Sequence, residues 1–308
     1  MILRDWRQAD PTLLRSCYDA ERHSWRQDLG WDTTWTWATV EQARVTRGLP
    51  GLLAFDDDRE LRGWAFYLRD GGTLHIGGLV SSSPDITRQL LDAILKTAPD
   101  AAACFIRDRA PELSDALRIR GFDAERFLYL SRPVRPGERP QGTPELHGPD
   151  VTDSWCDADL AAAARLLWEG YPRTASRHFA PDGSIEDWTK YVAGVVGQGG
   201  CGRLDPDATR VIRDGDELRG LALVTSIAPE TAHLAQLVVH PEHRGRGVAS
   251  ALLREVLARA AASGRTAMTL LVSERNRPAR QMYGVAGFTE RGTFVAGRCA
   301  RLDSASII

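Results

Sequence analysis

The sequence of 308 residues contains no long apolar run and no large excess of charge of either sign. No stretch approaches 18 uninterrupted apolar residues, and the first ten residues, MILRDWRQAD, contain no hydrophobic signal core. We therefore expect no membrane span and no secretion signal, and a cytoplasmic location. The 39 basic and 41 acidic side chains leave a net charge of −2. This balance gives no reason to expect nucleic acid as a partner.

Cysteines are few, and no two of them form a C-x-x-C pair. This pattern indicates a reducing compartment rather than a disulfide framework or a zinc site. We expect no metal centre. The five cysteines are scattered along the chain at Cys17, Cys104, Cys156, Cys201 and Cys299.

A proline-rich segment divides the chain into two halves. Residues 133–150 contain five prolines together with several glycines. Proline at this density disfavours both a long helix and a central strand, so we predict a semi-extended linker. The expected domains are therefore 1–132 and 151–308.

The two halves repeat one order of predicted elements. Each contains a helical start, a hairpin, a strand, an amphipathic helix, a strand, a short helix and a final strand. We predict an α/β (α+β) fold with two tandem mixed sheets flanked by helices, formed by internal duplication. In the first half the elements are 10–25, 51–70, 73–81, 84–98, 102–108, 110–122 and 125–131. In the second half they are 157–171, 186–196, 208–228, 232–240, 248–264, 267–273, 277–288 and 289–298.

The stretch HPEHRGRGVASALL, residues 240–253, joins a predicted strand to a predicted helix. Gly245 and Gly247 permit positive φ and a close approach of a ligand to the backbone. The free N–H groups and the dipole of a helix start favour an anion, and Arg244 and Arg246 add positive charge. The spacing matches neither the P-loop nor the Rossmann loop. We interpret this corner as a cradle for phosphate.

Two motifs resemble those of the GNAT superfamily of N-acetyltransferases. Arg244-x-x-Gly247-x-Ala249 is similar to the acyl-CoA pyrophosphate loop of that family, [QR]-x-x-G-x-[GA]. The segment NRPARQMYGVAGF, residues 276–288, is similar to the family's N-x-x-A-x-x-x-Y-x-x-x-G-F block. The motifs cover about 150–300, whereas 1–130 resembles the family only in element order. The resemblance implies acetyl-CoA as donor and direct transfer of its acetyl group to an amine.

The resemblance also implies which residues hold the donor. Backbone groups of Leu237, Val238 and Val239 would line the pantetheine arm, and Asn276 would lie beside it. An N–H on this strand would stabilise the oxyanion of the tetrahedral intermediate. The pyrophosphate would accept hydrogen bonds from the turn made of Arg244, Gly245, Arg246, Gly247, Val248, Ala249 and Ser250.

Two side chains are implied in proton transfer. Tyr283 would protonate the leaving thiolate as general acid; the alternative is a buried aromatic on a helix face. His233 would be the base, because its ordinary pKa of about 6.5 suits proton transfer near neutrality; the alternative is a solvent-facing histidine at a strand start. Gln236 could orient a water, and Glu230 is an alternative carboxylate.

The acceptor is expected between the first two helices of the second half and the strands. The residues of that entry segment are Trp168, Tyr171, Ser176 and His178, although the helical spacing of Trp168 favours a place in the core. A small-molecule amine is the expected acceptor. A peptide or protein amine, a longer acyl-CoA donor and a non-catalytic CoA-binding module are the alternatives.

The first half departs from the family pattern. Its equivalent corner, LVSSSPDITR, lacks the glycine loop and places Asp85 where a pyrophosphate would lie; Leu117 stands where Tyr283 stands in the second half. We expect a GNAT-like scaffold without a cofactor site. The tryptophan-rich segment GWDTTWTW, residues 30–37, is too aromatic for an ordinary loop. It would pack beneath a long loop or against the other domain, or it would form an aromatic wall for the acceptor.

Overall fold

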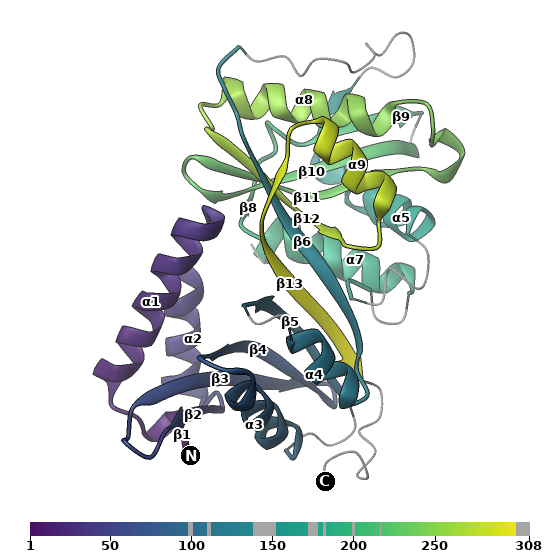
Figure 1. Cartoon of the computed structure of the whole chain (residues 1–308). Helices are drawn as coiled ribbons and strands as arrows, with labels where there is room; N and C mark the ends of the chain where they lie inside the picture. Colours follow the sequence, from purple (N-terminus) through teal and green to yellow (C-terminus); the bar gives the residue numbers. More distant parts are fainter. Residues whose placement is uncertain are drawn as a thin grey trace. The chain divides into compact units, whose positions relative to one another are not determined.

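The computed structural model describes residues 1–97, 101–109, 112–137, 152–171, 178–180, 183–198, 201–215 and 217–299 (Figure 1). The chain forms two compact units, and most of the predicted linker lies outside the described residues. Unit 1 comprises Met1–Tyr129, Ser273–Arg275 and Arg291–Ile308, and unit 2 comprises Leu130–Val272 and Asn276–Glu290. The units therefore differ from two consecutive halves, because part of the final strand lies in unit 1.

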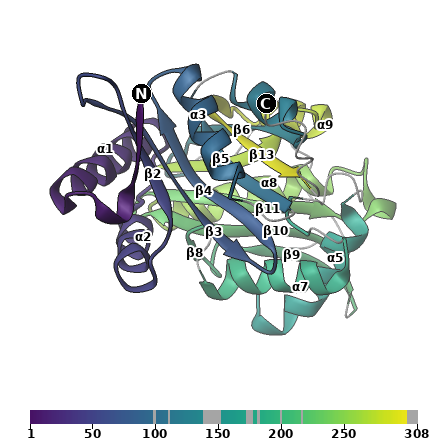
Figure 2. The ribbon, with the colours of Figure 1, turned by 90° about the horizontal axis from the view of Figure 1, so that it is seen from below.

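Unit 1 contains a mixed sheet with strand order β1-β2-β3-β4-β5-β13-β6. Figure 2 shows β2, β3 and β4 side by side. Its helices are α1 (Pro11–Leu29), α2 (Thr34–Arg47), α3 (Pro84–Leu95) and α4 (Leu113–Ile119). The strands are β1 (Ile2–Asp5), β2 (Gly51–Phe55), β3 (Leu61–Asp70), β4 (Thr73–Ser81), β5 (Ala101–Asp108) and parts of β6 (Asp123–Pro133) and β13 (Thr289–Cys299).

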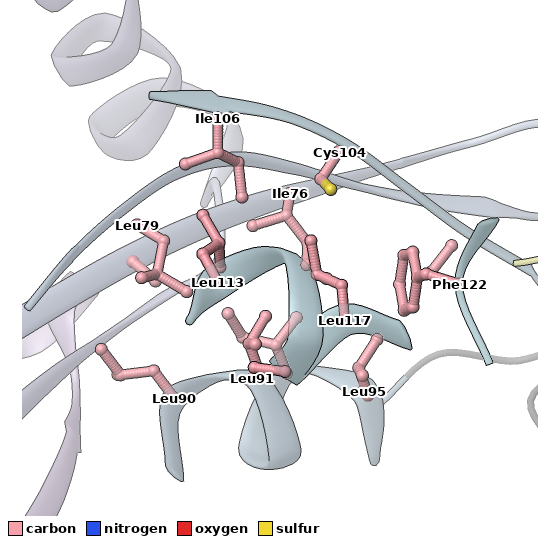
Figure 3. Packing of buried hydrophobic residues seen from close by; sticks show 14 of the residues in the cluster. Ile76, Leu79, Leu90, Leu91, Leu95, Cys104, Ile106, Leu113, Leu117 and Phe122 are labelled. Atoms are coloured by element: carbon pink, nitrogen blue, oxygen red, sulfur yellow. The ribbon is translucent and has the colours of Figure 1, made fainter. Parts of the chain in front are cut away.

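The core of unit 1 is apolar on the side of α3 and α4 (Figure 3). Leu117 of α4 is completely buried there, close to Leu91 and Phe122. Val295 of β13 belongs to the same core, because β13 pairs antiparallel with β5. The final strand thus completes the core of unit 1.

The second half of the tryptophan-rich segment 30–37 is helical. Thr34–Arg47 forms α2, which ends at Gly48 with φ of 63°. Trp37 packs with Tyr18 and Trp64 in a buried aromatic cluster. Trp35, by contrast, is 81% exposed. Packing within unit 1 therefore accounts for most of the buried aromatic surface of this segment.

Unit 2 contains the strand order β12-β11-β10-β9-β7, with β8 beside β10. Its strands are β7 (Asp153–Ser154), β8 (Arg203–Leu204), β9 (Arg210–Asp214), β10 (Glu217–Ala228), β11 (Thr231–Val239) and β12 (Ala267–Ser273). Its helices are α5 (Leu160–Gly170), α7 (Ile185–Ala193), α8 (Val248–Ala262) and α9 (Arg277–Val285).

Helices cover both faces of the sheet in unit 2 (Figure 1). A Cβ on Gly220 would meet Val248 and Leu252 of α8, whereas the next residue, Leu221, packs with α5 and α7. Successive strand residues point to opposite faces, so α8 lies on one face and α5 with α7 on the other.

The repeated order of elements in the two units extends to a strand irregularity. The equivalent strands β4 and β11 each contain 9 residues, and each pairs in parallel with its neighbour through its first four residues. A bulge follows at the fifth residue of each strand, Gly77 in β4 and Ala235 in β11. A bulge re-aims the backbone of one strand relative to its neighbour. Both units therefore contain the same strand distortion, and they differ in the turn and the helix start that follow the strand.

Candidate active site

The turn between β11 and α8 has the backbone that its glycines predict. After one 3-10 turn at Pro241–His243, Gly245 has φ of 75° and Gly247 has φ of 83°. A Cβ on Gly245 would meet no atom within 4 Å, so its conformation rather than lack of space requires glycine. Residues 244–250 are called the anion turn below.

No side chain caps the start of α8. The N-cap residue is Gly247, which has no side chain to accept a hydrogen bond, and the first turn contains no acidic residue. The first backbone hydrogen bond of this helix runs from Ala251 N–H to Gly247 O at 3.0 Å. Among the described residues, the N–H groups of Val248, Ala249 and Ser250 have no acceptor. Such a helix start is suited to an anion.

The equivalent helix of unit 1 is closed to an anion. Ser83 caps α3 by accepting a hydrogen bond from Ile86 N at 3.4 Å, and Asp85 lies in the first turn. The Asp85 carboxylate also pairs with Arg88. A side-chain cap and a carboxylate occupy the positions that a phosphate would need.

The side chain of Arg244 binds protein carbonyls. Its Nε donates to Val239 O at 3.2 Å, and its Nη2 donates to Gly170 O at the end of α5. Arg244 and Arg246 are both exposed residues, but Arg246 makes no side-chain hydrogen bond within the described part of the chain. The two arginines of the anion turn thus differ in their contacts, although the sequence suggests one role for both.

Strands β11 and β12 are paired only at their starts. Parallel pairing begins at Thr231 and ends at Leu234, and no later pair occurs among the described residues of these strands. The bulge at Ala235 follows directly. One edge of residues 235–239 is therefore without a strand partner.

Backbone groups of Leu237 and Val239 face this unpaired edge. His240 donates its N–H to Arg219 O of the β10 side at 2.8 Å. Because antiparallel neighbours alternate between hydrogen-bonded and non-bonded pairs, Val238 bonds toward β10, and the residues on either side point away from it. Leu237 therefore directs its backbone N–H and C=O to the unpaired edge, and so does Val239, whose carbonyl accepts from Arg244 Nε.

Tyr283 lies on α9 and is 7% exposed. Its ring centroid is 5.7 Å from that of Phe288. Burial, with a smaller contribution from the nearby Tyr171 phenol, raises the pKa of Tyr283 well above its ordinary value. The phenol is therefore protonated at neutral pH, as a general acid must be. Asn276 caps the same helix, accepting from Ala279 N at 3.2 Å.

A buried hydrogen-bonded chain joins three elements on the α5–α7 face. Tyr171 donates to Gln236 Oε1 at 2.7 Å, and Gln236 Nε2 donates to Tyr191 OH at 2.6 Å. Burial raises the pKa of Tyr171 to about 12, and the Arg244 charge opposes this shift. Sequence reasoning identified Tyr171 but not Tyr191. The only sequence signal for Tyr191 is its position beside the buried face of an amphipathic helix.

His233 is 2% exposed, and its Nδ1 lies 2.9 Å from Thr269 Oγ1. Burial lowers its pKa to about 4, so the imidazole is neutral at pH 7. The alternative of a solvent-facing histidine is therefore wrong. A buried ring with this pKa is also a weak base for an alkylammonium group.

The remaining predicted residues are dispersed. Trp168 is 42% exposed, so the expectation that it lies in the core is wrong. His178 is half-buried, and Glu230 lies at the turn between β10 and β11. Ser176 lies outside the described residues. Within the described part of the chain, no cluster of three or more His, Cys, Asp or Glu could hold a metal ion.

One family model matches part of the second half of the chain. Residues 160–288 match the model of the acetyltransferase (GNAT) family. None of the curated proteins matches the sequence. None of the helices in the described ranges is both long and apolar enough to cross a membrane.

Several solved structures share the fold. A GCN5-related N-acetyltransferase from Sphaerobacter thermophilus is 18% identical with a TM-score of 0.62, covering 96% of this chain and 94% of that one. A tandem GNAT protein from the clavulanic acid biosynthesis pathway is 18% identical with a TM-score of 0.51, covering 82% of each chain. A glucosamine N-acetyltransferase region of a fungal β-N-acetylglucosaminidase is 12% identical with a TM-score of 0.56, covering 96% of this chain and 38% of that one.

Proposed function

Because residues 160–288 form a domain of the acetyltransferase (GNAT) family, which is an acyltransferase family, we propose that unit 2 binds acetyl-CoA and acetylates a primary amine. The observation that carries this proposal is the uncapped start of α8 behind two glycines with positive φ. The N–H groups of Val248, Ala249 and Ser250 would hold the pyrophosphate. The backbone groups of Leu237 and the N–H of Val239 on the unpaired edge would bind the pantetheine amides, and an N–H there would polarise the thioester carbonyl.

The transfer is a direct displacement. The amine nitrogen attacks the thioester carbon, the carbonyl oxygen becomes an oxyanion, and the carbon–sulfur bond then breaks. Tyr283 gives its proton to the departing thiolate sulfur, supported by a raised pKa that keeps the phenol protonated. The amine loses one proton to an ordered water rather than directly to His233, because burial lowers the pKa of that histidine to about 4.

We propose a small-molecule amine as acceptor, with a peptide amine or a longer acyl donor as second candidates. Tyr171 supports an acceptor on the α5–α7 face, because its phenol is held by the hydrogen bond to Gln236 and keeps a lone pair that can accept from an amine. Unit 1 would serve as a scaffold without a cofactor site. A reducing, cytoplasmic compartment is part of the proposal and is supported by five free cysteines.

Native mass spectrometry with acetyl-CoA tests the donor assignment. We expect one acetyl-CoA per chain, followed by release of CoA thiol when amines are screened. Two molecules per chain would contradict the inactive unit 1, and none would overturn the donor assignment. CoA binding without release of thiol in any amine or peptide screen would favour a non-catalytic module.

A further inference from the structure

We propose that Arg244 is a positioning residue that joins the anion turn to the acceptor side of unit 2, rather than a ligand of the donor phosphates. This inference rests on the proposed function. The guanidinium donates to Val239 O at the end of β11 and to Gly170 O at the end of α5. It therefore bridges the strand that precedes the anion turn and the helix that precedes Tyr171.

Both carbonyls need such a donor. Val239 O lies on the edge of β11 that has no strand partner, and Gly170 O is one of the last carbonyls of a helix, which lack intrahelical donors. A cation at this end also complements the helix dipole. The planar guanidinium can donate in two directions at once, which a lysine ammonium on its flexible stem does less well.

A second contact lies beside the first. His240 Nε2 lies 3.4 Å from Glu169 Oε2, so the residues on both sides of the 3-10 turn at Pro241–His243 contact the last turn of α5. The packing is close, because a Cβ on Gly170 would lie 2.5 Å from Val238 Cγ2. The end of α5 therefore lies directly against β11.

The consequence concerns Tyr171, which directly follows Gly170. Its N–H donates to Leu167 O at 2.9 Å, and its phenol donates to Gln236. A shift of the anion turn on donor binding would be transmitted through Arg244 to Gly170 and then to Tyr171. Arg244 thereby lets the occupied donor site order the residue that faces the acceptor.

The test compares Arg244→Ala with Arg246→Ala, a matched arginine of the same turn. Acetyl-CoA affinity is measured by calorimetry at two salt concentrations, and amide hydrogen exchange of α5 is followed with and without acetyl-CoA. Loss of a charge-assisted phosphate contact in Arg246→Ala should weaken binding about 10-fold and reduce its salt dependence. Arg244→Ala should weaken binding less than about 3-fold but abolish the donor-dependent protection of the Tyr171 amide.

Arg244→Lys is the second variant, in case the alanine variant does not fold. It keeps the charge, so it should bind acetyl-CoA with unchanged salt dependence and still lose most of the protection of α5. The inference is overturned if either Arg244 variant retains that protection, or if Arg244→Ala loses affinity and salt dependence as Arg246→Ala does. If the wild-type protein binds no acetyl-CoA, the proposed function itself fails, which is a separate result.

Discussion

Tyr171 and Gln236 share a buried hydrogen bond of 2.7 Å in which the phenol is the donor and the amide oxygen the acceptor. The direction follows from the chemistry of the pair, because an amide oxygen carries no hydrogen and can only accept, while the Gln236 amide nitrogen donates to Tyr191. The oxygen of Tyr171 therefore keeps a lone pair for a hydrogen bond from an incoming amine. Toward the substrates Tyr171 would therefore accept a hydrogen bond, whereas the proposed role of Tyr283 is to donate a proton.

Replacement of Gln236 by leucine should damage both the fold and the acceptor side. Two buried phenols would lose their partner, at a cost of about 1–3 kcal/mol in the free energy of unfolding for each unsatisfied group. Urea unfolding measures this loss. Gln236→Glu is the matched control, since it keeps an acceptor for Tyr171 and should retain more stability than leucine at a pH where the carboxyl is protonated. Equal stability of Gln236→Leu and wild type would contradict the structural importance of the chain.

Replacement of Tyr283 by phenylalanine should slow turnover and leave donor binding intact. Loss of a general acid typically costs about 10²- to 10⁴-fold in kcat. The affinity for acetyl-CoA, measured by calorimetry, should change less than about 3-fold, because the ring and its contact with Phe288 remain. Tyr129→Phe is the control: this phenol is also buried, but it donates to Leu29 O in unit 1. Comparable losses of turnover in both variants would indicate a general effect of removing a buried hydroxyl.

Alanine substitutions at two glycines with similar φ distinguish the effect of backbone strain from that of ligand binding. Gly245 has φ of 75° and Gly264, after the other end of α8, has φ of 74°; a Cβ on either would meet no atom within 4 Å. Alanine at each should therefore cost about 1 kcal/mol of stability. Only Gly245→Ala should also weaken acetyl-CoA binding, because only that residue lies in the anion turn. An equal loss of affinity in Gly264→Ala would indicate that the weaker binding comes from a disturbance of α8 as a whole rather than from the anion turn.

The strand, turn and helix around the anion turn could be predicted because each has its own local signal. β11 is an apolar run, α8 has apolar residues at helical spacing, and the glycines between them mark positive φ. The partners of Arg244 could not be predicted in the same way. Gly170 is far from Arg244 in the sequence, and no local pattern records a contact between a side chain and a distant carbonyl.

Two features of unit 1 could not be predicted from the sequence either. Helix α2 contains threonine and tryptophan, which favour a helix only weakly, and burial of Trp37 in the aromatic cluster outweighs that preference. The strand β13 follows unit 2 in the sequence, yet Val295 packs in the core of unit 1. Strand periodicity identifies the buried face of a strand but not the sheet to which it belongs.

His233 should make the free energy of unfolding depend on pH. Burial lowers the pKa of the folded-state imidazole to about 4, against about 6.5 in the unfolded chain. Between these values the unfolded chain binds a proton here and the folded chain does not, so stability is greatest above pH 6.5 and falls as the pH falls toward 4. The full effect is about 3 kcal/mol, from 1.36 kcal/mol for each pKa unit.

His233→Gln should remove this contribution, because glutamine can still bond to Thr269 but does not titrate. Urea unfolding at pH 7 and at pH 4.5 should then show a smaller difference for the variant than for the wild type. If an ordered water rather than His233 is the base, kcat at pH 7.5 should fall less than about 10-fold. A loss of 10³-fold or more with an unchanged fold would instead identify the buried imidazole as the base.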